Sequence, residues 1–312
     1  MRKKLFCVAA VSLLAVFGVG KVSSADLLVS SEDTDQVLRY DGVTGAFLGV
    51  FASGGGLDEP RGLAFGPDGH LYVNSNYTDS ILRYDGKTGA FIDIFISGIP
   101  SPDGLVFGPD RNLYVGSYSG NSILRYNSNT GAFIDEFVKP GSGGLSIPRG
   151  FSFGPDENLY VCGGNSWNVL QYDGSSGDFI SEFIPPGSGG LVYEPLDVEF
   201  GQDGQLYLTD RYGNNIRRYD GTTGLPIDVF ASGGNLDTPF GLCFGPDRNL
   251  YVSDVGNGSI KRYNGLTGEF IDEFVSSGSG GLLQPNYLVF TPEPATLLLL
   301  GLGAAIIRKF RN

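Results

Sequence analysis

Residues 102–137 read PDGLVFGPDRNLYVGSYSGNSILRYNSNTGAFIDEF and contain four short apolar runs. The runs are GLVF, NLYV, SILRY and AFIDEF, and they are separated by segments rich in Gly, Pro, Asn and Asp. Short runs rich in Val, Leu, Phe and Tyr with such boundaries are typical of strands joined by hairpins. The stretch therefore predicts one antiparallel sheet of four strands.

Copies of this unit fill the chain between its two ends. A Tyr in the third run recurs every 42–47 residues, and a Phe in the first run recurs with a Pro five residues before it. The tyrosines are Tyr40, Tyr84, Tyr126, Tyr172, Tyr219 and Tyr263, and the phenylalanines are Phe65, Phe107, Phe153, Phe200, Phe244 and Phe290. Repeats of this length with four strands each predict the blades of a β-propeller.

The chain is cut inside the repeat. Residues 27–29 match the second strand of the unit, and residues 287–290 match the first strand. The two ends together complete a sixth blade, which removes the exposed edges of an open array. We therefore predict an all-β fold over residues 26–291: a six-bladed β-propeller of four-stranded antiparallel blades, closed by the N- and C-terminal strands.

One Asp recurs in the turn after the first strand. It follows Gly-Pro in four of the five copies and Gly-Gln in the other: Asp68, Asp110, Asp156, Asp203 and Asp247. Asp in such a turn accepts hydrogen bonds from its own backbone. Because the sequence has no D-x-D-x-D-G loop, we expect these carboxylates to close hairpins and not to bind calcium.

The two chain ends have targeting patterns. Residues 1–25 combine a basic start, an apolar run and small residues before Asp26, which is typical of a signal peptide for Sec-dependent export. A retained membrane anchor is the alternative interpretation. The middle, residues 26–291, holds 14 basic and 33 acidic residues, and this acidity argues against a nucleic-acid partner.

Residues 292–312 begin with Pro292, Glu293 and Pro294, continue with an apolar stretch, and end in a basic cluster that includes Arg308 and Lys309. This segment resembles the PEP-CTERM sorting signal. The resemblance implies recognition by exosortase-type machinery, transient anchoring in the inner membrane through a short membrane-spanning segment, and a final location at the cell surface or in the extracellular matrix. As an alternative, residues 290–293 also match the start of a repeat hairpin.

The repeat itself is similar to NHL repeats. The pattern P-x-G-L-x-F-G-P-D-G-x-L-Y-V, followed by I-x-R-Y-D-G, covers roughly residues 26–291. The wider group of six-bladed propellers includes gluconolactonase-like hydrolases, streptogramin lyases and amidating lyases. The resemblance implies the fold and leaves the activity open, because one fold hosts many functions.

Variable loops are expected on one face of the ring, around the mouth of the central channel. They are the turns between second and third strands and the connections that enter each first strand. We interpret this face as a binding surface for a polysaccharide or a protein, the alternative being unconstrained loop residues. Its candidate ligand-binding residues are Arg61, Asp103, Tyr118, Arg149, Trp167, Asp197, Arg211, Tyr212 and Asn286.

Enzymatic signatures are weak. The single His, His70, is expected on the opposite face, and no catalytic residue is assigned. A divalent-metal lactonase or lyase with its site at the channel mouth is the alternative function, with calcium or another divalent ion bound by Asp103, Asp197 and Asn286. Arg61 and Arg149 would oppose such a cation, so we predict no cofactor and no metal. Cys162 and Cys243 lie in different repeats and are expected to be free, buried thiols.

Overall fold

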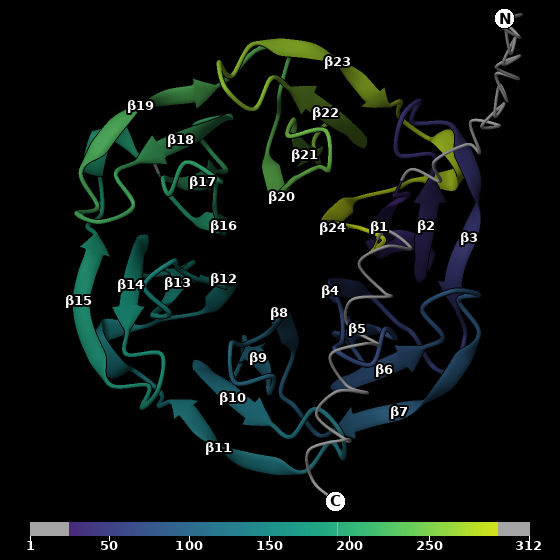
Figure 1. Ribbon diagram of the computed structural model, residues 1–312, viewed down its shortest axis with the longest axis horizontal. Coiled ribbons are helices and arrows are strands. Elements are labelled where there is room, and N and C mark those ends of the chain that lie inside the picture. Colours follow the sequence, from purple (N-terminus) through teal and green to yellow (C-terminus); the bar gives the residue numbers. More distant parts are fainter. Residues whose placement is uncertain (1–24, 192, 293–312) are drawn as a thin grey trace, which may run out of the picture.

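A computed structural model describes residues 25–191 and 193–292 of the chain. These residues form six four-stranded antiparallel sheets arranged as a ring (Figure 1). In each sheet the first strand of the repeat lies innermost and the fourth lies at the circumference. The predicted six-bladed propeller is therefore confirmed.

The strands follow the four apolar runs of every repeat. The closing blade contains β24 (Pro285–Phe290), β1 (Leu27–Ser31), β2 (Gln36–Tyr40) and β3 (Phe47–Ser53). The next two contain β4 (Pro60–Phe65), β5 (Leu71–Ser75), β6 (Ser80–Tyr84), β7 (Phe91–Ser97), and β8 (Pro102–Phe107), β9 (Leu113–Ser117), β10 (Ser122–Tyr126), β11 (Phe133–Val138).

The other three blades have the same order. They contain β12 (Pro148–Phe153), β13 (Leu159–Gly163), β14 (Asn168–Tyr172), β15 (Phe179–Ile184); β16 (Pro195–Phe200), β17 (Leu206–Asp210), β18 (Asn215–Tyr219), β19 (Pro226–Ala231); and β20 (Pro239–Phe244), β21 (Leu250–Asp254), β22 (Ser259–Tyr263), β23 (Phe270–Val275). Short 3-10 turns occur at η1 (Glu32–Thr34), η2 (Ser142–Gly144), η3 (Ser188–Gly190) and η4 (Ser279–Gly281).

The two ends of the ring close on each other as the repeat phase predicts. Strand β1 pairs antiparallel with β24, with Leu27 opposite Phe290. Beyond this pair, the N–H of Asp26 donates to Thr291 Oγ1 at 2.8 Å, and the N–H of Thr291 donates to the carbonyl of Asp26 at 2.8 Å. These contacts join residues about as far apart in sequence as the ring allows.

A repeated aromatic contact joins neighbouring blades. In five of the six blades a Tyr of the second strand packs edge-to-face on the first-strand Phe of the next blade, with ring centroids 4.9–5.1 Å apart. Each such Tyr also donates its hydroxyl to the hairpin Asp of its own blade at 2.9–3.0 Å. The same Asp accepts the backbone N–H two residues later, so the predicted hairpin role is confirmed.

The remaining expectations concern the two cysteines, the two chain ends and a membrane-spanning segment. Cys162 is free and buried, as expected, whereas Cys243 is free but only half-buried. The signal peptide and most of the sorting segment, including Glu293, Pro294, Arg308 and Lys309, lie outside the described residues. Within residues 25–191 and 193–292, no helix has the length and apolar character needed to cross a membrane.

Candidate functional site

A polar cavity of about 300 Å³ opens at the mouth of the central channel. Its walls come from the turns between second and third strands and from the connections into first strands, which is the face where variable loops were expected. The lining residues are Glu32, Glu59, Arg61, Asn76, Tyr77, Ser101, Tyr118, Arg149, Arg211, Phe240, Val255, Gln284 and Asn286. His70 lies in the hairpin between β4 and β5, at the opposite end of β5 from this cavity.

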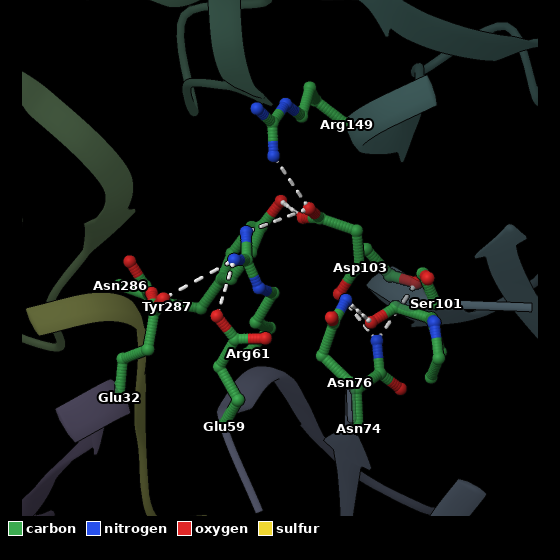
Figure 2. A network of polar contacts seen from close by, with 12 residues as sticks. Glu32, Glu59, Arg61, Asn74, Asn76, Ser101, Asp103, Arg149, Asn286 and Tyr287 are labelled. Carbon is green, nitrogen blue, oxygen red and sulfur yellow. Dashed lines mark hydrogen bonds and ion pairs between the residues drawn. The ribbon is translucent and has the colours of Figure 1, made fainter. Parts of the chain in front are cut away.

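Asp103 is the centre of an ionic network (Figure 2) that includes two residues lining this cavity, Arg61 and Arg149. Its fully buried carboxylate accepts from Arg61 at 3.2 Å and from Arg149 at 2.9 Å through the same oxygen, Oδ2. The hydroxyl of Tyr287 donates to the other oxygen at 2.9 Å. Because two guanidiniums from neighbouring blades share one buried carboxylate, their positions are fixed across three blades.

Two carboxylates hold the other side of Arg61. Its Nη2 lies 3.1 Å from Glu59 and 3.3 Å from Glu32, and Glu32 also accepts from the amide of Asn286. Burial and the neighbouring Glu32 raise the pKa of Glu59 to about 7, although Arg61 opposes the shift. The carboxyl group of Glu59 therefore titrates near neutral pH.

Amide side chains fix the backbone beneath Asp103. Asn74 donates to the carbonyl of Asp103, and Asn76 donates to the carbonyl of Pro102 at 3.1 Å (Figure 2). Both come from β5 or the turn after it, in the blade before β8. The start of β8 is thus positioned by its neighbour, which makes the site pre-organised.

Glu194 connects this network to a second group of side chains. Its two carboxylate oxygens accept separately, Oε1 from Arg149 at 2.8 Å and Oε2 from Arg211 at 2.9 Å. Each guanidinium in turn covers one aromatic ring: Arg149 lies 4.7 Å from the centre of Tyr118, and Arg211 lies 5.3 Å from that of Tyr212. We call these five residues the ionic frame.

A second cavity, of about 450 Å³, adjoins the first and shares Tyr118 with it. Its walls are largely aromatic, and the lining residues are Tyr118, Ile147, Gly164, Asn165, Trp167, Tyr193, Glu194 and Tyr212. Trp167 and Tyr193 meet edge-to-face with ring centroids 4.6 Å apart. We call this space the aromatic cavity, and the first one the central cavity.

The residues named from the sequence are thus distributed between the two cavities. The central cavity receives Arg61, Tyr118, Arg149, Arg211 and Asn286, and the aromatic cavity receives Trp167 and Tyr212 together with the shared Tyr118. Asp103 lines neither cavity, but it binds Arg61 and Arg149, which line the central one.

Asp197 takes a different place, inside the channel. Its carboxylate is buried and accepts the backbone N–H groups of Val198 and Leu242, both at 3.0 Å. Burial raises its pKa to about 7, and these two hydrogen bonds partly oppose the rise. It faces a separate internal space that Glu199 and Cys243 also line.

The three oxygen donors considered for a divalent ion do not converge. Asp103 is bound to two guanidiniums, Asn286 donates its amide to Glu32, and Asp197 lies in the channel interior. Among residues 25–191 and 193–292, no three His, Cys, Asp or Glu side chains are grouped as metal ligands. The residues present at the mouth therefore fit a divalent cation poorly.

Several site residues were not named from the sequence. Glu59 and Glu194 directly precede the repeat Pro, Tyr193 comes one residue earlier, and Glu32 follows the second strand of the closing blade. The residues expected at the mouth follow each repeat Pro, whereas both glutamates precede one. Extending the same comparison by one position would have found both glutamates.

Comparison with known proteins identifies the tail and the fold. Residues 290–311 match the PEP-CTERM protein-sorting motif, which implies export, transient anchoring at the membrane through the C-terminus and recognition by exosortase-type sorting machinery. A search of curated proteins gives no significant match.

Solved structures resemble the whole ring. A chain of a nidogen/laminin complex aligns with a TM-score of 0.71 at 17% identity, over 86% of this chain and 99% of that chain. A protein of unknown function from Bacteroides caccae aligns with a TM-score of 0.65 at 12% identity, over 87% and 100%. Virginiamycin B lyase from Staphylococcus aureus aligns with a TM-score of 0.55 at 21% identity, over 78% and 82%.

At these identities the likeness shows the fold. Sequence motif and strand arrangement together give one conclusion. The chain is a six-bladed β-propeller that carries a PEP-CTERM protein-sorting motif at residues 290–311.

Proposed function

We propose that this chain is an exported propeller that binds extracellular polysaccharide through the face around the channel mouth. In this proposal residues 1–25 direct export, residues 26–291 form the binding ring, and residues 292–312 hold the protein at the inner membrane until sorting. The protein then acts at the cell surface or in the extracellular matrix. The sorting motif supports the location, and the two adjoining cavities support the binding role.

The single observation that carries the proposal is the pairing of a polar cavity with an aromatic one. The central cavity presents guanidinium N–H donors and carboxylate acceptors in fixed positions, which suits a ligand with many hydroxyl groups. The aromatic cavity beside it presents exposed rings of Trp167, Tyr193 and Tyr212. Alternating polar and apolar faces are the chemical character of a sugar chain.

The charge of the site favours an uncharged polymer. Three guanidiniums, of Arg61, Arg149 and Arg211, are each bound by carboxylates at the mouth. The ring around them is strongly acidic, with 14 basic and 33 acidic residues in 26–291. An anionic polysaccharide would meet repulsion from the ring and paired cations at the site.

Array binding tests the proposal directly. The exported protein is applied to a glycan array and to an array of surface proteins from the bacterium that produces it. We expect saturable binding to one class of polysaccharide, weakened by Arg211→Gln, which removes one guanidinium from the frame. Leu266→Asn, an exposed residue in a turn on the opposite face, serves as the matched control. Binding to proteins alone, or equal binding by Arg211→Gln, would overturn the proposal.

The metal-dependent alternative has its own test. Metal analysis of the purified chain, together with thermal unfolding in calcium, magnesium and zinc, measures whether a divalent ion binds. The engaged donors at the mouth predict no stoichiometric metal and an unchanged unfolding temperature. A bound ion that raises the unfolding temperature would favour the lactonase-like function over polysaccharide binding.

A further inference from the structure

Trp167 occupies a backbone position that every other blade gives to a small or turn-forming residue. The position lies directly before the third strand, and its φ is positive in all six blades, +59° at Trp167. The equivalent residues are Asp35, Asp79, Asn121, Asn214 and Gly258, with φ between +52° and +63°. Gly, Asn and Asp tolerate this left-handed conformation, whereas a bulky aromatic residue does so at a cost.

The other blades also use this position for a hydrogen bond that Trp167 cannot make. In four of them the side-chain oxygen accepts the backbone N–H of the residue before the next repeat Pro, at 2.7–2.9 Å. In the blade of Trp167 the corresponding N–H belongs to Glu194. An indole ring has a donor and no acceptor for it.

The tryptophan is also poorly buried. The residue is 42% exposed, and Tyr193 beside it is 48% exposed. Burial of Trp167 therefore stabilises the fold less than burial of a core tryptophan would. A residue that occupies an unfavourable backbone conformation, replaces a hydrogen-bonding side chain and remains exposed is typical of a functional position.

The surroundings of Trp167 hold its neighbours rigidly. Tyr118 and Tyr212, on the other walls of the aromatic cavity, are each covered on one face by a guanidinium of the ionic frame. Glu194 binds both guanidiniums and itself lines the cavity. Rigid aromatic walls with few rotatable bonds lose little entropy when a ligand binds.

These contacts discriminate between classes of ligand. An aromatic cavity attracts quaternary ammonium groups when a free carboxylate supports it. Here the carboxylate of Glu194 is neutralised twice, and the guanidiniums of Arg149 and Arg211 lie against two of the rings. Fixed positive charge on the tyrosines opposes a cation, and the acidic ring opposes an anion. The cavity therefore suits an uncharged ligand with an apolar face and polar edges.

We propose that Trp167 and Tyr193 form a subsite for one uncharged pyranose ring, with the sugar's C–H face on one of these two nearly perpendicular rings and its hydroxyl edge toward Asn165 and Glu194. This inference rests on the proposed polysaccharide-binding function and adds the position and the ligand class. The cavity volume of about 450 Å³ accommodates one to two sugar rings. The sugar chain then continues over Tyr118, which the two cavities share, into the central cavity.

The experiment uses intrinsic fluorescence, because Trp167 is the one tryptophan of the chain. The full-length protein is titrated with hexasaccharides of neutral glucose, mannose and galactose, with a hexasaccharide of galacturonic acid, and with tetramethylammonium. Isothermal calorimetry is run in parallel. We expect a neutral hexasaccharide to change the emission saturably. Trp167→Asn, which the backbone accepts well, should weaken calorimetric binding about tenfold or more, whereas Trp167→Phe should keep most of it.

The outcomes separate this inference from the proposed function. A neutral hexasaccharide that binds wild type and Trp167→Asn equally would overturn the subsite and leave mouth binding in place. Stronger binding of galacturonate or tetramethylammonium than of every neutral sugar would overturn the ligand class. No response to any hexasaccharide at about 10 mM, where millimolar affinity approaches saturation, would overturn the inference as a whole. The control Leu266→Asn should bind as wild type does.

Discussion

Replacing Trp167 by Asn and, separately, by Ala measures how much the positive φ and the missing hydrogen bond at this position reduce the stability of the fold. Both variants remove the indole and its contact with Tyr193, so the loss of aromatic packing is the same in both. The variants differ in two respects that the other blades define. Asn tolerates a φ near +59° and offers a side-chain oxygen to the N–H of Glu194, whereas Ala provides neither.

The expected difference follows from these two terms. A left-handed backbone conformation costs an alanine about 1 kcal/mol more than an asparagine. The side-chain hydrogen bond that four other blades form at 2.7–2.9 Å contributes about 1 kcal/mol. Trp167→Asn should therefore be about 2 kcal/mol more stable than Trp167→Ala. In a ring of this size that corresponds to an unfolding temperature about 4 °C higher.

Urea unfolding followed by circular dichroism gives the free energies, and thermal unfolding gives the temperatures. Asn121→Ala is the matched control, because Asn121 already makes this hydrogen bond to Ile147 in the neighbouring blade. It should lose about 2 kcal/mol relative to wild type for the same two reasons. Equal stability of the two Trp167 variants, alongside a clear loss in Asn121→Ala, would refute the reasoning. It would mean that the turn at Trp167 relaxes freely.

Three further predictions concern the channel, the network and the tail. Burial raises the pKa of Asp197 to about 7, so the native carboxyl keeps a proton that the unfolded chain releases near pH 4. As pH rises from about 4 to 7, the free energy of unfolding of wild type should fall by up to about 4 kcal/mol relative to that of Asp197→Asn, as measured by urea unfolding. Asp103→Ala leaves Arg61 and Arg149 without their shared buried partner and should cost about 3–5 kcal/mol, whereas the exposed-pair control Asp228→Ala should cost under about 1 kcal/mol. Deleting residues 295–312 should keep the unfolding temperature, since β24 and Thr291 remain, whereas deletion from residue 285 should abolish cooperative unfolding.

The architecture could be predicted from the sequence because the same four-strand pattern recurs in six copies. Every first-strand Pro and every third-strand Tyr marks a boundary that recurs, and chance cannot align both across the chain. Ring closure was accessible for a further reason: residues 27–29 and 287–290 belong to complementary strands of the unit. Neither inference required knowledge of any side-chain contact.

The site was accessible only in part because its members come from different blades. Position after the Pro placed Arg61 and Arg149 at the mouth, but not their ion pairs with Asp103 and Glu194. Asp197 follows Leu196, the residue equivalent to Arg61 and Arg149. Because successive residues of a strand face opposite sides, the carboxylate of Asp197 lies in the channel interior and not at the mouth. Contacts between blades depend on the rotation from one blade to the next, which local sequence does not specify.

A repeated scaffold makes its own departures informative, provided that structural causes are separated from others. Leu28 departs from the Tyr of the other second strands, and the structure explains it. The hydroxyl of that Tyr needs the Asp of the first hairpin, and in the closing blade β24 and β1 are not joined by a hairpin. Trp167 departs in the opposite sense, since it replaces the hydrogen-bonding Asp or Asn of four other blades while keeping their positive φ. A departure that the scaffold explains carries no functional information, and one that opposes the scaffold does. On this criterion the boundary between the blades of Trp167 and Glu194 is the place in the ring where we propose that a ligand binds.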